Sequence, residues 1–204
     1  NEGNLKDYPE GKKKLRDYQH EVVDNFIDAL TQMGKAQIIM ATGLGKTVVM
    51  AETIASLIRS NPNIQKILVL AHTRPIINQL HQNFWYQLSK WVPTQQMSEG
   101  ELPISFEGVT FALIQSIVNK LDVLPRFDLI LVDEAHHIGS LSYLKSLENI
   151  SPNMLAGVTA TPWRGDRFDL DSVLGAPVCQ IGIEEGLRRG FLAEVDYRLL
   201  ADNL

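Results

Sequence analysis

A seven-residue stretch from Ala41 to Thr47 carries the residue types that could hold a nucleoside triphosphate. Gly43 and Gly45 allow the main chain to turn tightly and to direct its N–H groups at phosphate oxygens. The ammonium group of Lys46 can pair with the β and γ phosphates, and the hydroxyl of Thr47 can bind Mg²⁺. The stretch is therefore a candidate site for a magnesium–triphosphate complex.

The elements expected around this stretch fit phosphate binding, although one position departs from the general P-loop pattern. An apolar run at 37–40 precedes the stretch, and a helix expected at 46–59 would direct the positive end of its dipole at the same anion. Met40 stands where the general pattern has its first glycine. The stretch alone is thus a lead that needs support from other residues.

A second candidate site is the carboxylate pair Asp133 and Glu134, directly after the apolar residues 129–132. Charged groups at the exit of an apolar strand are costly unless they are solvated, paired or bound to metal. Asp133 could bind Mg²⁺ through water, and Glu134 could orient and activate an attacking water molecule. The alternative is a strand that simply runs into a solvated turn.

Two hydroxyl groups follow another apolar run, at Thr159 and Thr161, and Pro162 comes next. They could form hydrogen bonds with the acidic turn and respond to the presence of the γ-phosphate. The alternative is a proline-ended turn in which the threonines cap the local main chain.

The composition is that of an ordinary globular protein, with 204 residues of which 45% are apolar and 21% charged. The formal net charge of −5 gives no general electrostatic support for nucleic-acid binding. No apolar run approaches the length of a membrane span, and the start of the sequence does not resemble a signal peptide. We therefore expect no membrane partner. The single cysteine, Cys179, suits a reducing compartment, so a cytoplasmic location is expected.

Short apolar runs alternate with helical periodicity along the chain, which predicts an α/β fold. Strands are expected at 37–40, 66–71, 109–114, 128–133, 154–159 and 178–182, and helices at 17–33, 46–59, 75–91 and 140–149. The strand runs show no alternation of apolar and polar residues, as in strands buried on both faces. We therefore predict a three-layer, doubly wound, mainly parallel sheet with ligands at the carboxyl ends of its strands.

Taken together, three motifs resemble the first RecA-like lobe of a superfamily 2 DEAD/DEAH-type helicase or translocase. They are Gly-Lys-Thr at 45–47, Asp-Glu-Ala-His at 133–136 and Thr-Ala-Thr-Pro at 159–162, in that order. The resemblance implies a RecA-like P-loop NTPase domain at 15–192 with ATP and Mg²⁺ as cofactors. It also implies a polar leader at 1–14 and, at 193–204, the start of a connection to a second RecA-like lobe.

The resemblance assigns the residues around the triphosphate. ATP would be bound by the loop residues Thr42, Gly43, Leu44, Gly45, Lys46 and Thr47. Lys46, Asp133 and Glu134 would be catalytic. Mg²⁺ would be held by Thr47 and, through water, by Asp133.

Two further groups of residues are implied to serve the same site. Arg16 and Gln19 resemble the element that binds the adenine base, although the same residues could simply begin an amphipathic helix. His136, Thr159 and Thr161 resemble the residues that couple the acidic turn to the threonine motif.

The expected nucleic-acid contacts follow two other strands. The run 68–74, followed by Gln79, resembles a segment that contacts the nucleic-acid backbone, with Thr73 and Arg74 as the expected phosphate contacts. Gln115 and Ser116 resemble a second backbone-contacting turn. A surface loop with an ordinary arginine is the alternative for the first segment.

Two segments narrow the branch within the superfamily. Residues 161–166, Thr-Pro-Trp-Arg-Gly-Asp, and the exit segment 183–192 resemble type I and type III restriction motors and related DNA-repair translocases. The chain also lacks the Asp-Glu-Ala-Asp form typical of RNA-unwinding relatives. Double-stranded DNA is therefore the expected partner, in preference to RNA. In the resembling family an arginine from the second lobe assists hydrolysis, so the isolated chain is expected to be weakly active.

Other features have simpler explanations. The adjacent His136 and His137 are not expected to form a zinc site, and the aromatic residues 84–86 are expected mainly to pack a helix on the sheet. Cys179 is expected to be a buried, inert thiol. Two other functions remain open: a nucleic-acid-gated ATPase switch that does not unwind its substrate, and a noncatalytic interaction module on a P-loop scaffold.

Overall fold

Residues 10–97, 101–161 and 168–193 are described by the computed structural model of the chain. Within these ranges, seven strands form one parallel sheet in the order β3-β4-β2-β5-β6-β1-β7. The strands are β1 (Lys35–Met40), β2 (Lys66–Ala71), β3 (Thr94–Gln96), β4 (Gly108–Leu113), β5 (Leu129–Asp133), β6 (Met154–Thr159) and β7 (Pro177–Ile181). The α/β sheet architecture predicted from the sequence is confirmed.

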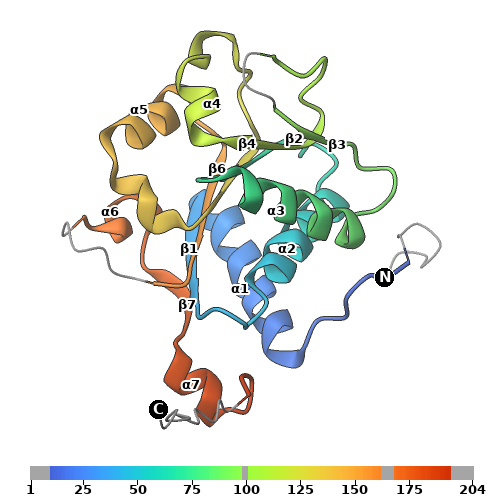
Figure 1. Cartoon of the computed structure of the whole chain (residues 1–204), viewed down its shortest axis with the longest axis vertical. Helices are drawn as coiled ribbons and strands as arrows, with labels where there is room; N and C mark the ends of the chain where they lie inside the picture. Colours follow the sequence, from blue (N-terminus) through green and yellow to red (C-terminus); the bar gives the residue numbers. More distant parts are fainter. Residues whose placement is uncertain (1–9, 98–100, 162–167, 194–204) are drawn as a thin grey trace, which may run out of the picture.

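Helices cover both faces of this sheet, so the domain has three layers (Figure 1). One face carries α1 (Asp17–Met33), α2 (Lys46–Ser60) and α3 (Arg74–Gln87). The other carries α4 (Ile114–Val118), α5 (Leu141–Ile150), α6 (Leu170–Leu174) and the 3-10 helices η2 (Leu121–Val123) and η3 (Ala135–Gly139). A last helix, α7 (Ile183–Arg188), follows β7 and lies at the end of the sheet where β1 enters the loop to α2 (Figure 1).

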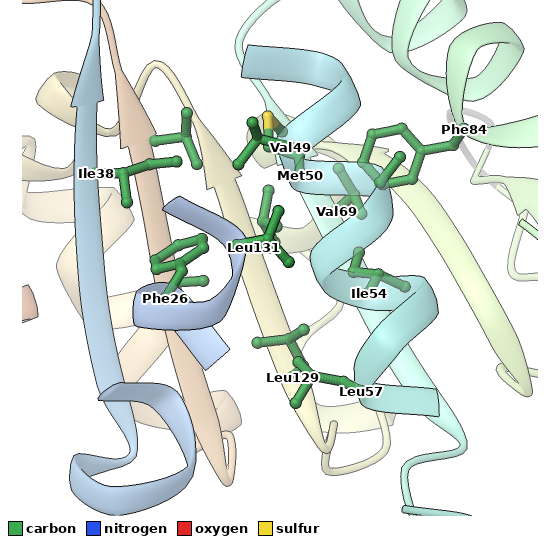
Figure 2. Packing of buried hydrophobic residues seen from close by; sticks show 14 of the residues in the cluster. Phe26, Ile38, Val49, Met50, Ile54, Leu57, Val69, Phe84, Leu129 and Leu131 are labelled. Carbon is green, nitrogen blue, oxygen red and sulfur yellow. The ribbon is translucent and has the colours of Figure 1, made fainter. Parts of the chain in front are cut away.

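The central strands form because their side chains are buried on both faces. In β2, Ile67 and Val69 pack under α1, α2 and α3, whereas Leu68 and Leu70 pack under α4, α5 and α6. Figure 2 shows the first of these layers, in which Phe26 from α1 and side chains of α2 lie over β1, β2 and β5. Two complete cores therefore hold the strands in register, which places their carboxyl ends together at one edge.

The expected elements agree with this arrangement within one or two residues, except at the end of one helix. The helix expected at 75–91 ends at Gln87, because Leu88 adopts an extended conformation with φ −80° and ψ 150°. The strand expected at 109–114 ends at Leu113, and Ile114 begins α4 instead. The sequence did not predict β3, because this strand is short and polar and contains no apolar run. Among the described strands it pairs with β4.

The remaining sequence expectations concern the chain's ends and isolated residues. Residues 1–9 of the leader, residues 162–167 and residues 194–204 lie outside the described residues. In the described part of the leader, the main-chain N–H of Lys13 donates to the side chain of Gln87 at 2.7 Å. Cys179 is half-buried rather than buried, and burial raises the pKa of its thiol to about 11, as an inert thiol requires. Among the described helices, none combines the length and apolar character needed to cross a bilayer.

A close contact in β6 ties the sheet to the turn after β5, which generates a prediction. A Cβ atom at Gly157 would lie 2.2 Å from Cδ1 of Leu174, which is fully buried, and 3.0 Å from Cβ of Ala135. Gly157→Ala is therefore expected to destabilise the fold by about 1–3 kcal/mol in urea denaturation, the usual cost of overpacking. Gly182→Ala is the matched control, because nothing lies within 4 Å of that position. Equal stability of the two variants would contradict the packing seen here.

Candidate functional site

The loop between β1 and α2 has the main-chain geometry of a phosphate-binding turn. Gly43 and Gly45 have φ values of 90° and 82°, in the left-handed region that favours glycine. A side chain at Gly45 would also collide with the amide of Gln19, since its Cβ would lie 2.4 Å from Nε2. The glycines are thus required by conformation and by space, and the N-terminus of the fifteen-residue helix α2 begins immediately after them.

Lys46 begins α2, and its ammonium group lies against the loop. Its Nζ atom donates to the carbonyl oxygen of Met40 at 3.3 Å. The same ammonium charge acts on Asp133, where it lowers the pKa of the carboxyl group. The loop after β1 and the turn after β5 lie at the same edge of the sheet, because the strands are parallel and only β6 separates them.

Asp133 ends β5 in a setting that disfavours its charge. Burial raises the pKa of Asp133 to about 6, the Glu134 carboxylate adds to the rise, and the Glu134 main-chain N–H and Lys46 oppose it. The positive charge of Lys46 therefore offsets only part of the cost of ionising Asp133. A divalent cation would supply the missing positive charge.

The described residues fit Mg²⁺ held mainly by a nucleotide and water. No group of three or more histidine, cysteine, aspartate or glutamate side chains able to enclose a metal occurs in the described ranges. Mg²⁺ typically keeps several waters and takes one or two protein oxygens together with substrate phosphates. Thr47 and Asp133 supply such oxygens, so the donor set fits the predicted magnesium site.

Glu134 occupies a strained position at the centre of a small polar network. Its φ of 50° is left-handed, which is uncommon for a residue with a side chain. Its Oε2 atom lies 3.3 Å from Nδ1 of His136 and 3.5 Å from the hydroxyl of Thr159. Its conformation is therefore held by the neighbouring 3-10 helix and by β6.

The predicted coupling residues are brought together by this network. Nδ1 of His136 and Oγ1 of Thr159 lie 2.8 Å apart, and the Thr159 hydroxyl donates to the carbonyl oxygen of Thr161 at 3.0 Å. The N–H of Thr161 in turn lies 3.3 Å from Oγ1 of Thr159. Thr159 thus contacts the acidic turn through its hydroxyl, as predicted, while Thr161 contacts Thr159 through its main chain.

The residues predicted to bind adenine lie beside the phosphate loop. Gln19 is buried, and its Nε2 donates to the carbonyl oxygen of Leu44 at 2.9 Å. Its Oε1 accepts from the main-chain N–H of Arg16, whose guanidinium donates to the carbonyl oxygen of Phe191 at 3.1 Å. The adenine contacts remain a prediction, and the structure shows these two residues supporting the loop and the exit segment.

Three residues near the site were not identified from the sequence. The ring of Tyr18 stacks on Phe191 with centroids 4.0 Å apart, and its hydroxyl donates to the carbonyl oxygen of Leu44 at 2.8 Å. Tyr143 is buried beside Asp133, so that burial and then the charge of Asp133 raise the pKa of its phenol. Spacing alone could not reveal the contact of Tyr18 with Phe191, because it joins elements far apart in the chain.

The predicted nucleic-acid residues lie at the same edge of the sheet, on the other side of β5 from the loop. Thr73 and Arg74 follow β2 and are exposed, and Gln115 and Ser116 lie in the first turn of α4, close after β4. β2 and β4 are adjacent strands, so the two pairs are neighbours at the edge. Gln79 is exposed further along α3. The structure therefore brings the two turns together, whereas their contact with nucleic acid remains a prediction.

Comparisons with known proteins agree with this arrangement. Residues 12–164 match the family described as type III restriction enzyme, res subunit. The chain is 26% identical over 193 residues to the DNA 3'-5' translocase XPB2 of Sulfurisphaera tokodaii, covering 93% of this chain and 40% of that protein. It spans 28%, 27% and 40% of the lengths of three curated relatives that it matches.

Two solved structures share the fold. One is a nuclease-deletion mutant of the type ISP restriction-modification enzyme LlaGI in complex with a DNA substrate mimic, with a TM-score of 0.71 at 20% identity over 87% of this chain and 21% of that one. The other is the helicase domain of Hef from Pyrococcus furiosus, with a TM-score of 0.71 at 21% identity over 90% of this chain and 42% of that one. At these identities the likeness establishes a RecA-like fold.

The raised pKa of Asp133 has a measurable consequence for stability. An aspartate that protonates more readily when folded than when unfolded destabilises the fold above its folded pKa, here about 6, and ceases to do so below its ordinary value of 3.8. Asp133→Asn is therefore expected to raise the free energy of unfolding by about 3 kcal/mol at pH 8, since each unit of the rise in pKa from 3.8 to about 6 corresponds to about 1.4 kcal/mol.

This gain should disappear near pH 4, where the folded wild type carries a protonated Asp133. Denaturant unfolding of both proteins at the two pH values measures the difference. Asp24→Asn, on the exposed side of α1, is the control and should change little. A stability loss from Asp133→Asn at pH 8 would show that the carboxylate is not held at a cost.

Proposed function

The chain belongs to the family of the type III restriction enzyme res subunit, and from this premise we propose that it is the ATP-binding lobe of a DNA translocase or helicase. The single observation that carries the proposal is the placement of the glycine-rich loop after β1 and the acidic turn after β5 at the same edge of the parallel sheet, with only β6 between the two strands. A phosphate loop and an acidic turn that face one another are the two halves of an ATP-hydrolysing site.

The chain's own residues would divide the reaction among them. The loop N–H groups and Lys46 would hold the β and γ phosphates and offset the charge that develops on them. Mg²⁺, held by Thr47 and through water by Asp133, would neutralise phosphate charge when bound. Glu134 would align the water that attacks the γ-phosphorus, with its carboxylate oriented by His136 and Thr159.

The proposed DNA path crosses the carboxyl ends of β2 and β4. Thr73 and Arg74 begin α3, so an exposed helix N-terminus and a cation coincide there, as suits a phosphate contact. The names of the relatives support DNA as the partner: one is a DNA translocase, and one structural neighbour is in complex with a DNA substrate mimic. We further propose that a second RecA-like lobe in the intact protein completes the site with an arginine, worth on the order of a thousandfold in rate.

A reducing, cytoplasmic compartment is part of the proposal.

A nucleic-acid-gated ATPase switch is the second candidate, because it would need the same residues. A noncatalytic module is disfavoured, since Lys46, Thr47, Asp133 and Glu134 are all retained. Displacement of a triplex-forming strand from duplex DNA by the intact protein with ATP separates a motor from a switch. A motor displaces the strand, and a switch hydrolyses ATP without displacing it.

Glu134→Gln tests the proposed reaction. The substitution removes a carboxylate that would align water but leaves the phosphate loop intact. The intact protein should therefore bind ATP within about twofold of wild type and lose hydrolysis by about 100-fold or more. Equilibrium ATP binding and steady-state phosphate release measure the two properties. Glu148→Gln, on the exposed side of α5, is the control, and turnover by Glu134→Gln close to this control would remove Glu134 from the reaction.

Arg74→Ala tests the proposed DNA path. Loss of one phosphate contact should weaken duplex affinity and reduce the slope of log K against log salt by about one unit. Fluorescence anisotropy of labelled duplex at several salt concentrations gives the slope. Arg126→Ala is the matched control, because Arg126 is exposed just before β5 at the opposite edge of the sheet. An unchanged slope for Arg74→Ala would place Arg74 off the DNA path.

A further inference from the structure

Three histidine rings connect the proposed DNA path with Glu134. We infer that His72 and His137 are positioning residues that transmit DNA contact to Glu134 through His136. The inference rests on the proposed function, and it gives a role to two residues that had none: His72, which lies within the run 68–74, and His137.

The three rings form a continuous contact. The rings of His72 and His137 are stacked, with centroids 4.2 Å apart and planes 8° apart. The ring of His137 lies 4.1 Å from that of His136, with the planes inclined at 41°. A displacement of the first ring would therefore press directly on the second and, through it, on the third.

The inner end of this histidine stack contacts the group that would align water. Nδ1 of His136 lies 3.3 Å from Oε2 of Glu134 and 2.8 Å from Oγ1 of Thr159. The main chain of Glu134 is left-handed, which is uncommon for a residue with a side chain, and its carboxylate is contacted by His136 and Thr159. A small rotation of the His136 ring would therefore change where this carboxylate points.

The outer end of the stack lies where DNA would bind. His72 is exposed and stands directly before Thr73 and Arg74, at the carboxyl end of β2. β2 pairs with β5 in register, Leu70 opposite Val132, so the turn that carries His72 adjoins the turn that carries Glu134. A phosphate held by Thr73 and Arg74 would restrict the adjacent His72 ring and thereby select one arrangement of the stack.

A purely structural stack would not need this placement. Rings that only fill space are normally buried, whereas His72 is accessible from the edge proposed to contact DNA. A metal site is also not indicated, because the described residues contain no cluster with the required donors. Contact with both the DNA edge and the Glu134 network is the property that a coupling element requires.

The test compares His72→Ala with His72→Phe in the intact protein. In His72→Ala the exposed ring is removed, and kcat at saturating duplex DNA should fall about tenfold, a usual size for coupling between two sites. The KM for ATP, the hydrolysis rate without DNA and the Kd for duplex DNA should each stay within about twofold of wild type. His72→Phe keeps a flat ring in the stack and should restore the stimulated rate. The split between kcat and binding separates positioning from a mere structural defect.

A double-mutant cycle tests the route. In a His136→Ala background, His72→Ala should have no further effect on the stimulated rate, because the connection is already broken. Independent effects of the two substitutions would overturn the inference. The inference would also be overturned if duplex DNA stimulated ATP hydrolysis by His72→Ala as fully as by wild type, or if His72→Ala lost only its affinity for duplex DNA. It would likewise be overturned if His72→Phe were as impaired as His72→Ala.

The wild-type measurement in the same series separates the inference from the proposed function. If wild-type protein hydrolyses ATP but duplex DNA leaves its rate unchanged, both are overturned. If wild-type protein is stimulated and the variants respond like it, only the inference is overturned.

Discussion

The proposed site depends on one carboxylate, Asp133, which the fold holds at an energetic cost at the end of β5. Asp133 is placed by β5 where burial and Glu134 oppose its charge, and Lys46 offsets only part of that penalty. A partly buried carboxylate of this kind stabilises a fold poorly, because removing a charge from water is expensive. In the proposed site it would receive a divalent cation together with a polyanion, and the energetic deficit in the protein would then become affinity for that ligand.

The order of the strands in the sheet places Lys46 and Asp133 at the same edge. Lys46 follows β1 and Asp133 ends β5, with β6 between these strands in the sheet. Gly157 in β6 lets Leu174 and Ala135 approach closely, which holds the acidic turn against the strand. Because the strands are buried on both faces, their register is strongly specified, and the two turns have little freedom to separate.

The fold could be predicted from the sequence because its strands are continuous apolar runs and its long helices have clear periodicity. The phosphate loop and acidic turn were also predictable, since they join consecutive residues to strand ends. Contacts between distant segments were not. Tyr18 on Phe191, Tyr143 beside Asp133 and His72 on His137 depend on how separate elements pack, and no local pattern reports that. Gln19 illustrates the difference: its presence was recognised, but its hydrogen bond to Leu44 was not.

A crystal structure of the chain with Mg²⁺ and a non-hydrolysable ATP analogue tests the central claim most directly. One ion should contact the Thr47 hydroxyl and approach Asp133 through water. The Lys46 ammonium should leave the Met40 carbonyl, which it contacts at 3.3 Å here, for the phosphates. A triphosphate bound elsewhere, or an ion that touches the loop without approaching Asp133, would contradict the claim that these two turns form a single site.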